Sequence, residues 1–275
     1  MSDRVAAPRG TRVAQSFSVT ARHPESALRI VRDEAPDLPS SNWLLASLPP
    51  TVLAHMTPHL ERVRLDRKQT LFHLHERLRQ VYFPTTAIVS LVAALDSGET
   101  LDVGVTGRDG LVGAVALPDV SWMPCDGIVH FPGIAYRLDA GLFRQSLRNF
   151  EPLSAAVGRY AHLLLVRSLQ MQLCNLFHPV EQRLTRWLLT LSDLLASPDM
   201  PLTHDLVATM LGVRRPTVTL AVGSLRRAGL IEEKRGRITI RDREGLEAAC
   251  CDCYRLMCQQ QVKVLGYSCR GAVAA

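Results

Sequence analysis

The spacing of hydrophobic residues changes along the chain and divides it into segments. Residues 1–40 contain four prolines and show no sustained apolar period, so we predict a disordered tail there. From residue 41 the apolar positions recur at helical spacing, which predicts short helices before the first strand. The residues expected to bury are Leu44, Leu45, Leu48, Val52, Leu53 and Leu60.

Between about residues 63 and 138 the period becomes that of β-strands. The run TLDVGV (100–105) alternates, which puts Leu101, Val103 and Val105 on one face. LDSGET predicts a hairpin loop, because Gly98 can adopt the positive φ that such a turn needs. GIVHFPGIAYRL predicts two more strands, with the break at Pro132-Gly133. Several short strands separated by turns favour a small β-sandwich or barrel within residues 41–150.

Helical spacing returns near residue 139, and its longest run covers residues 151–177. Its apolar seam has 4-3 spacing and only Arg167 interrupts it, while Leu169 and Leu173 are apolar residues outside the seam. A helix that is apolar on two sides needs two partners, and we predict the β-rich domain and a second copy of the chain. A single buried core helix is the alternative. The residues predicted to dimerise are Leu153, Val157, Tyr160, Leu164 and Met171.

Residues 178–260 carry the signals of a winged helix-turn-helix. The run at 178–196 predicts a helix with Pro179 in its first turn, and its expected stripe is Leu184, Trp187, Leu188, Leu191 and Leu195. Thr203 is a predicted N-cap, and Gly212 permits the turn that ends this short helix. The next helix has Pro216 in its first turn, ends at Gly229 and has the predicted buried stripe Val218, Ala221, Val222 and Leu225. IEEKRGRITI then predicts a hairpin turning at Gly236, and we expect a flexible tail over residues 261–275.

Charge and composition restrict the class of function. The net charge of +6 and the pI near 9.1 favour an anionic partner. No signal peptide and no membrane-spanning run is evident, so we expect a cytoplasmic protein with reduced thiols and no membrane partner. P-loop, HExxH and GxSxG motifs are missing from the sequence, and we predict no catalytic residues.

The basic residues of the 178–260 segment lie where a helix-turn-helix contacts DNA. Arg214 and Arg215 precede the second helix, and further cations surround the tip of the hairpin. We therefore predict double-stranded DNA as the partner. The predicted contact residues are Thr203, Arg214, Arg215, Thr217, Thr219, Leu220, Ser224, Arg227, Lys234, Arg235 and Arg237. A merely solvated basic face, or a ligand- or redox-sensing module that docks a protein, is the alternative.

Over residues 41–250 the chain resembles the Crp/Fnr family of bacterial transcription regulators. LGVRRPTVT is similar to the family's G-x-S-R-x-T-V stretch, with Arg215 and Thr217 at the positions of its base-contacting Arg and its Thr. The resemblance implies an α+β protein with a cyclic-nucleotide-binding-like β-roll, a dimerisation helix and a winged helix-turn-helix. It also implies a homodimer on an inverted-repeat operator and RNA polymerase as a partner. Pro216 and Leu220 replace a base-reading Glu and Arg, which puts the family's usual target in doubt.

The stretch from Gly104 to Phe131 resembles the family's ligand cassette, and its candidate ligand residues are Gly107, Arg108, Gly110 and Gly113. The glycines favour a preserved turn and short helix. Cyclic phosphate needs an arginine fork, yet no arginine lies between Arg108 and Arg137. We predict the β-roll without standard cyclic-AMP binding and without a cofactor, and leave a cyclic nucleotide or another small effector as the alternative. Residues 1–40 hold no cysteine for an iron–sulfur cluster, and haem ligation is a further alternative, with candidate ligands His73, His75, His130 and His162.

Four of the seven cysteines lie in CCDCYRLMC, residues 250–258. Cys250 and Cys253 have the spacing of a metal knuckle, but no second pair follows at a zinc-ribbon distance. We predict that these thiols pack in the protein and hold no metal. Redox-responsive thiols and metal ligation are the alternatives.

Overall fold

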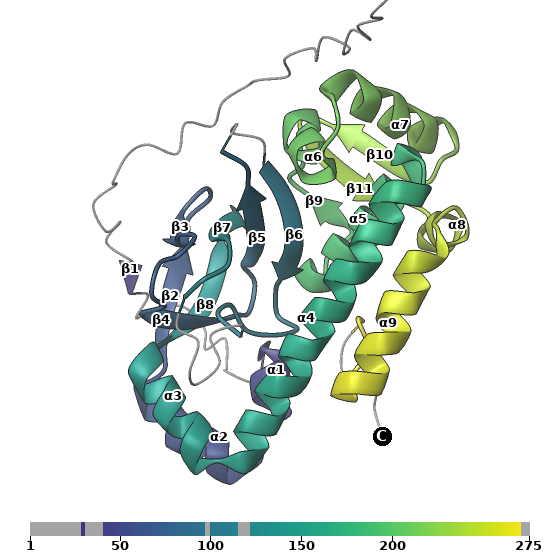
Figure 1. Ribbon diagram of the computed structural model, residues 1–275. Coiled ribbons are helices and arrows are strands. Elements are labelled where there is room, and N and C mark those ends of the chain that lie inside the picture. Colours follow the sequence, from purple (N-terminus) through teal and green to yellow (C-terminus); the bar gives the residue numbers. More distant parts are fainter. Residues whose placement is uncertain (1–28, 31–40, 97–99, 115–121, 271–275) are drawn as a thin grey trace, which may run out of the picture.

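The computed structural model describes residues 29–30, 41–96, 100–114 and 122–270 (Figure 1). The predicted disordered tail therefore lies outside the described residues, except for the short strand β1 (Arg29–Ile30), which pairs with β2. The predicted hairpin residue Gly98 also lies outside them. The short helices expected after residue 41 are present as α1 (Trp43–Ala46), α2 (Pro50–Met56) and the 3-10 helix η2 (Thr57–His59).

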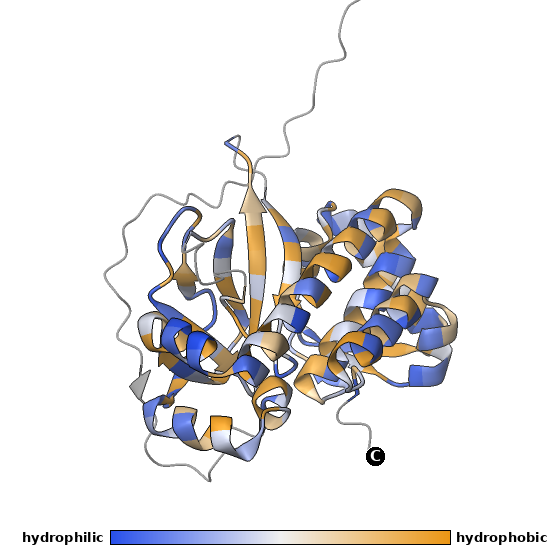
Figure 2. Cartoon of the chain, turned by 60° about the horizontal axis from the view of Figure 1, so that its bottom comes forward, coloured by the Kyte–Doolittle hydropathy of each residue, from blue (hydrophilic) through white to orange (hydrophobic). Residues whose placement is uncertain are grey.

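Two antiparallel four-stranded sheets form the N-terminal domain, as the alternating pattern predicts. One sheet has the order β1-β2-β8-β4 and the other β3-β7-β5-β6. The strands are β2 (Glu61–Leu65), β3 (Thr70–Phe72), β4 (Gln80–Pro84), β5 (Ile88–Ala94), β6 (Thr100–Thr106), β7 (Asp126–Phe131) and β8 (Gly133–Asp139). In Figure 2 the central strands are largely hydrophobic, whereas the helices alternate hydrophobic and hydrophilic segments.

The predicted break at Pro132-Gly133 separates strands of different sheets, since β7 and β8 do not pair with each other. A Cβ at Gly133 would lie 2.5 Å from the backbone nitrogen of Ala87. Only glycine allows the two backbones to approach this closely. The break therefore carries the chain from one sheet to the other.

Strand β6 alternates as predicted, and each of its faces packs against a different domain. Asp102, Gly104 and Thr106 are buried within the β-sandwich. The apolar face is turned outward, where Val105 joins the core of the C-terminal domain and Leu101 lies against Gly212. The β6 edge of this sheet is therefore a contact surface between the domains.

The rest of the chain is mainly helical. The helices are α3 (Ala140–Asn149), α4 (Glu151–Phe177), α5 (Val180–Leu195), α6 (His204–Leu211), α7 (Arg215–Arg227), α8 (Arg243–Ala248) and α9 (Asp252–Leu265). A small sheet of order β10-β11-β9 contains β9 (Asp199–Met200), β10 (Ile231–Lys234) and β11 (Arg237–Ile240). The predicted stripe of α5 is buried except for the partly exposed Leu195, and Pro179 is its N-cap rather than a first-turn residue. Among the described residues, no helix is long and apolar enough to cross a membrane.

The expectation of a flexible tail from residue 261 is wrong for residues 261–270. Helix α9 continues to Leu265 and runs beside α4 (Figure 1). Gln261 and Tyr267 are buried, and Cys269 forms a disulfide with Cys258. Residues 261–270 are held by polar contacts and by the disulfide, and the spacing of hydrophobic residues predicts neither. Residues 271–275 lie outside the described residues.

Candidate DNA-binding interface

The turn between α6 and α7 forms as the sequence predicts. The Thr203 hydroxyl accepts a hydrogen bond from the Leu206 backbone N–H at 3.3 Å and caps α6. Gly212 has a φ of +61°, a left-handed conformation that glycine adopts without steric cost, and it ends the helix. These two residues fix the angle at which α7 leaves the core.

Helix α7 buries one side and exposes the other. Val218, Ala221, Val222 and Leu225 are buried, so the predicted stripe is confirmed. Arg214 is the N-cap, and Pro216 lies in the first turn, where its missing N–H leaves no hydrogen bond unmade. The exposed residues include Arg214, Arg215, Pro216, Thr217, Thr219, Leu220 and Arg227, while Ser224 is partly exposed. The α7 ribbon lies at the outer edge of the molecule in Figure 1.

Leu220 is the most unusual member of this face. Its side chain is 74% exposed, on a helix whose other apolar residues are in the core. Exposed apolar side chains are common singly, but this one lies among the candidate DNA contacts. It can meet an apolar group of the partner, such as a thymine methyl.

The wing turns tightly at its basic tip. Strands β10 and β11 pair with Lys234 opposite Arg237, which leaves Arg235 and Gly236 in the turn. Both turn residues have positive φ, 50° and 74°, as a two-residue hairpin requires. Gly236 is therefore the turn residue predicted, and Lys234 and Arg235 are exposed beside it.

Several candidate DNA contacts already have partners within the chain. Arg215 Nε lies 3.5 Å from the Asp205 carboxylate, with both side chains exposed. The Thr219 hydroxyl lies 2.9 Å from His204 Nδ1, and the Ser224 hydroxyl donates to Glu181 at 3.1 Å. These three polar side chains of α7 therefore each contact another element of the same chain.

Arg237 differs from the other cations of the wing. Its Nε donates to both Asp199 oxygens at 3.1 and 3.0 Å, and its Nη2 donates to Oδ2 at 2.5 Å. The hydrogen bond from Arg237 lowers the pKa of Asp199, so the pair is charged on both sides at neutral pH. The positive charge of Arg237 is therefore largely balanced by the Asp199 carboxylate of the same chain.

The candidate ligand loop of the sensor is turned inward. Arg108 donates through Nε and Nη2 to the Thr85 carbonyl, each at 3.3 Å. A Cβ at Gly110 would lie 1.8 Å from the Tyr160 ring, and Gly113 has a φ of +102°. Residues 107–114 form turns, and residues 115–121 of the predicted cassette lie outside the described residues. Leu111 and Val112 are fully buried, so the loop is filled by its own side chains and by α4.

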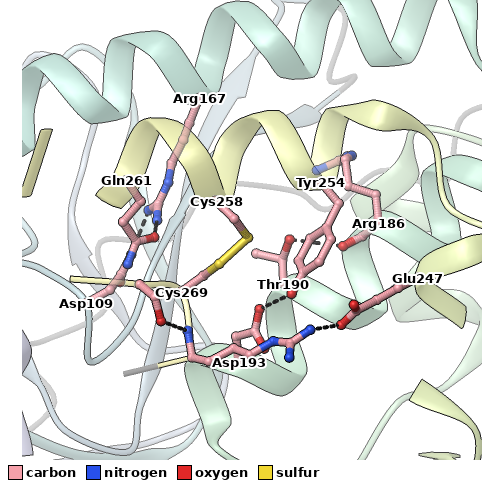
Figure 3. Close-up of a disulfide and its surroundings, with 12 residues drawn as sticks. Asp109, Arg167, Arg186, Thr190, Asp193, Glu247, Tyr254, Cys258, Gln261 and Cys269 are labelled. Carbon is pink, nitrogen blue, oxygen red and sulfur yellow. Dashed lines mark hydrogen bonds and ion pairs between the residues drawn. A yellow bond between two sulfur atoms is a disulfide. The ribbon is translucent and has the colours of Figure 1, made fainter. Parts of the chain in front are cut away.

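Asp109 joins this loop to both long helices. Its carboxylate pairs with Arg167 of α4 at 2.7 Å, and Arg167 also donates to Gln261 of α9 at 2.6 Å (Figure 3). Burial disfavours the charged Arg167, but the Asp109 carboxylate together with Tyr160 and Tyr267 outweighs burial, and the pKa of Arg167 is raised. The Tyr267 hydroxyl donates to the Asp109 carbonyl at 2.8 Å. Arg167, the single interruption of the predicted seam, thus has a buried acidic partner.

The dimerisation residues predicted on α4 lie mostly on the wrong side of the helix. Leu153, Val157, Tyr160 and Leu164 are buried in the core of the chain's own β-domain, and Met171 is partly exposed. The exposed apolar residues lie on another side and are Leu165, Leu169, Leu173, Leu176 and Phe177. Both sides have three- and four-residue spacing, so the pattern alone does not show which one faces inward.

The cysteines do not all carry the free thiols that the sequence predicts. Cys258 is bonded to Cys269, while Cys125, Cys174, Cys250, Cys251 and Cys253 are free. Figure 3 shows the disulfide between the Arg167 cluster and a second cluster that contains Asp193 and Tyr254.

The histidines considered for haem lie apart, in the β3–β4 connection, in β7 and on α4. Burial lowers the pKa of His130, in β7, to about 4.

Comparisons with known proteins agree with this geometry. Residues 182–249 match the model of the Crp-like helix-turn-helix domain. FixK2 from Bradyrhizobium japonicum is similar in structure, with 15% identity, a TM-score of 0.62 and coverage of 70% of this chain and 98% of that one. A CRP-family regulator from Thermus thermophilus has 21% identity, a TM-score of 0.56 and coverage of 68% and 95%. CLP of Xanthomonas campestris, described as a c-di-GMP responsive global regulator, has 18% identity, a TM-score of 0.56 and coverage of 70% and 99%. No curated protein sequence matches significantly.

The match and the exposed α7 define the class of the C-terminal part of the chain, which is a helix-turn-helix DNA-binding domain. Residues 182–249 therefore form a Crp-like helix-turn-helix domain, and the chain shares the fold of the regulators named above.

Proposed function

We propose that the protein is a homodimeric, sequence-specific regulator that binds an inverted-repeat DNA operator through α7 and the wing. The observation that carries the proposal is the exposed face of α7, with Arg214 and Arg215 at its leading end and a buried stripe behind it. A helix of this kind enters the major groove with its N-terminal residues against base edges.

The candidate contacts differ in role. Arg215 and Thr217 lie in the first turn of α7, where a guanidinium can bond a guanine edge. Arg214, Arg227, Lys234 and Arg235 are exposed cations suited to phosphates. Leu220 adds apolar contact where a polar reader would give stronger base discrimination, so we propose an operator unlike the family's usual one.

The dimer forms through the exposed apolar side of α4. Leu165, Leu169, Leu173 and Leu176 follow one another at three- or four-residue spacing and are each more than half exposed. Two such helices bury these residues against each other as a short coiled coil. The two recognition helices then lie about one DNA turn, roughly 34 Å, apart, which matches an inverted repeat.

The regulator works without standard cyclic-AMP binding. The one arginine of the candidate cassette, Arg108, is engaged with the Thr85 carbonyl, and Asp109 is engaged with Arg167. An anionic ligand would have to displace these contacts. Titration calorimetry with cyclic AMP is expected to show no binding at micromolar concentration.

DNA binding is tested by selecting bound sequences from a random duplex library and measuring affinity by fluorescence anisotropy at two salt concentrations. The selected sequences should form an inverted repeat, and affinity should fall steeply with salt because phosphate contacts release counterions. Arg215→Ala should weaken selected-site binding with the dimer intact, whereas the control Arg255→Ala, exposed on α9, should bind normally. If no sequence is enriched, the helical half docks a protein instead, and if Arg215→Ala binds the selected site as wild type, Arg215 is not a base contact.

The dimer surface is tested by Leu169→Asp, at a position 55% exposed in the single chain. Sedimentation should show a monomer with an unchanged circular dichroism spectrum. Leu95→Asp, at a position 67% exposed on the sensor, is the matched control and should remain dimeric. A dimer that survives Leu169→Asp excludes this side of α4 as the interface.

A further inference from the structure

Four potential metal ligands converge where α4 ends and α9 begins. Cys174 and His178 come from the end of α4, and Cys251 and Cys253 come from the start of α9. Their ligand atoms all lie within 4.8 Å of one another. We propose that these residues form a Cys3His site for zinc that joins the DNA-binding domain to the long helix.

Two distances in the cluster fit a tetrahedral zinc site. The Sγ atoms of Cys174 and Cys251 are 3.7 Å apart, and Cys253 Sγ is 3.5 Å from His178 Nδ1. With Zn–S near 2.3 Å and Zn–N near 2.0–2.1 Å, a tetrahedron has S···S edges of about 3.8 Å and S···N edges of about 3.6 Å. Both pairs are therefore at the separation that a shared zinc ion imposes.

Local structure places each pair of ligands on one face. His178 caps the end of α4 by donating its backbone N–H to the Cys174 carbonyl, one helical turn earlier. Residues four apart lie on the same side of a helix, so both side chains point toward α9. Cys251 is the N-cap of α9 and Cys253 lies in its first turn. The positive end of that helix stabilises thiolate charge.

The surroundings supply the charge and hydrogen bonds that such a site needs. Gln170 Nε2 donates to Cys253 Sγ at 3.1 Å. Arg186 is 3% exposed, and its Nε has no hydrogen-bond partner in the described part of the chain. The Arg186 guanidinium is a charge and hydrogen-bond partner of Cys174. Three thiolates around Zn²⁺ leave one negative charge, which the buried guanidinium balances.

The position of the site decides what the metal does. The three cysteines are buried and the protein supplies four ligands, so the site is closed to substrate and structural in type. It lies beside His178 and Pro179, where the chain passes from α4 into the DNA-binding domain. Zinc therefore fixes the angle between the dimer helix and the helix-turn-helix.

The full-length chain is purified under reducing conditions without a metal-affinity tag and is analysed by elemental mass spectrometry. We expect one zinc per chain, and X-ray absorption should show three sulfurs at about 2.3 Å and one nitrogen at about 2.0–2.1 Å. After removal of zinc by a chelator, Co²⁺ should give the intense visible bands of a tetrahedral thiolate complex. A chain that holds no zinc and gives no such bands, or one that holds iron and sulfide instead, overturns the proposal.

Neighbouring cysteines give matched variants. Cys251→Ser and Cys253→Ser should reduce the bound metal from one per chain to less than a tenth, whereas Cys250→Ser, beside the cluster but outside the four ligands, should keep it. Equal loss in Cys250→Ser and Cys251→Ser contradicts this ligand set. The cobalt titration of the wild-type chain needs no variant, so a variant that misfolds leaves the test intact.

Discussion

The sensor loop and the recognition helix use charged residues in opposite ways. In the loop, Arg108 donates to a backbone carbonyl and Asp109 forms an ion pair with Arg167, so the charges face the protein. At the leading end of α7, Arg214 and Arg215 face solvent. A charge that has a buried partner holds the fold together, and a charge without one is available to a ligand. The difference indicates that the loop couples domains while α7 binds a partner.

The largest expected effect is a loss of stability when the buried ion pair between Asp109 and Arg167 is broken. Asp109→Ala leaves the Arg167 guanidinium buried without its carboxylate, which typically costs about 3–5 kcal/mol. Urea unfolding should show a loss of that order, because the variant removes one partner only. The exposed pair between Arg64 and Asp66 provides the control, and Asp66→Ala should change stability by about 0.5 kcal/mol or less. A loss as small as the control's would show that Asp109 does not hold the loop to α4.

A second buried acid of the sensor makes stability depend on pH. Asp102 accepts hydrogen bonds from the Ser90 hydroxyl at 3.0 Å and the Gly104 N–H at 2.9 Å. Burial nevertheless raises the pKa of Asp102 to about 7. The unfolded carboxyl loses its proton near pH 4, so between about pH 4 and 7 the folded state holds more protons. Stability from Asp102 is therefore full below that window and is lost as pH rises through it.

Asp102→Asn is expected to remove this loss. The amide can keep both hydrogen bonds, and at about 1.4 kcal/mol per pKa unit the gain above pH 7 has an upper bound of about 4 kcal/mol. Urea unfolding from about pH 5 to 8 measures the slope that linkage predicts. Asp96→Asn, at an exposed position on the same domain, should keep the wild-type slope. Parallel wild-type and Asp102→Asn curves would contradict the assignment.

The next effect in size concerns the proposed recognition helix α7 and is measured with Arg215→Ala. Loss of a base-contacting arginine costs about 1–3 kcal/mol in binding and relaxes preference at one base pair. Anisotropy with the selected operator and with single-base variants measures both effects. Arg226→Ala, at an exposed position on the same helix outside the predicted contacts, is the control. Uniform weakening across all sequences would instead make Arg215 a phosphate contact.

The smallest expected effect is on the salt dependence of DNA binding, and it distinguishes the three cations of the wing. Lys234→Ala or Arg235→Ala should reduce the salt slope of DNA binding by about one, as expected for one lost phosphate contact. Arg237→Ala should change it less, because Asp199 already binds that guanidinium. The slope of log affinity against log salt, measured for all three variants, decides this. An equal change in all three would show that DNA displaces Asp199.

The helix-turn-helix followed from local signals. Thr203 caps α6, Gly212 ends it, and the stripe from Val218 to Leu225 is buried as its spacing predicts. Each of these features depends on residues within a few positions of one another, so the order of the chain contains the necessary information. The exposed face of α7 followed from the buried stripe.

Only the tertiary structure decided which apolar side of α4 faces inward and which residues meet across the chain. Arg167 needs Asp109, 58 residues away, and Cys174 meets Cys251, 77 residues away. Hydrophobic spacing gives a period but not the partner, and it led to the prediction that Leu153, rather than Leu169, lies in a dimer interface. The Cys-x3-His spacing of Cys174 and His178 was a readable signal for one half of the metal cluster. Its meaning depends on α9 packing beside α4, and long-range packing alone brings the other two cysteines there.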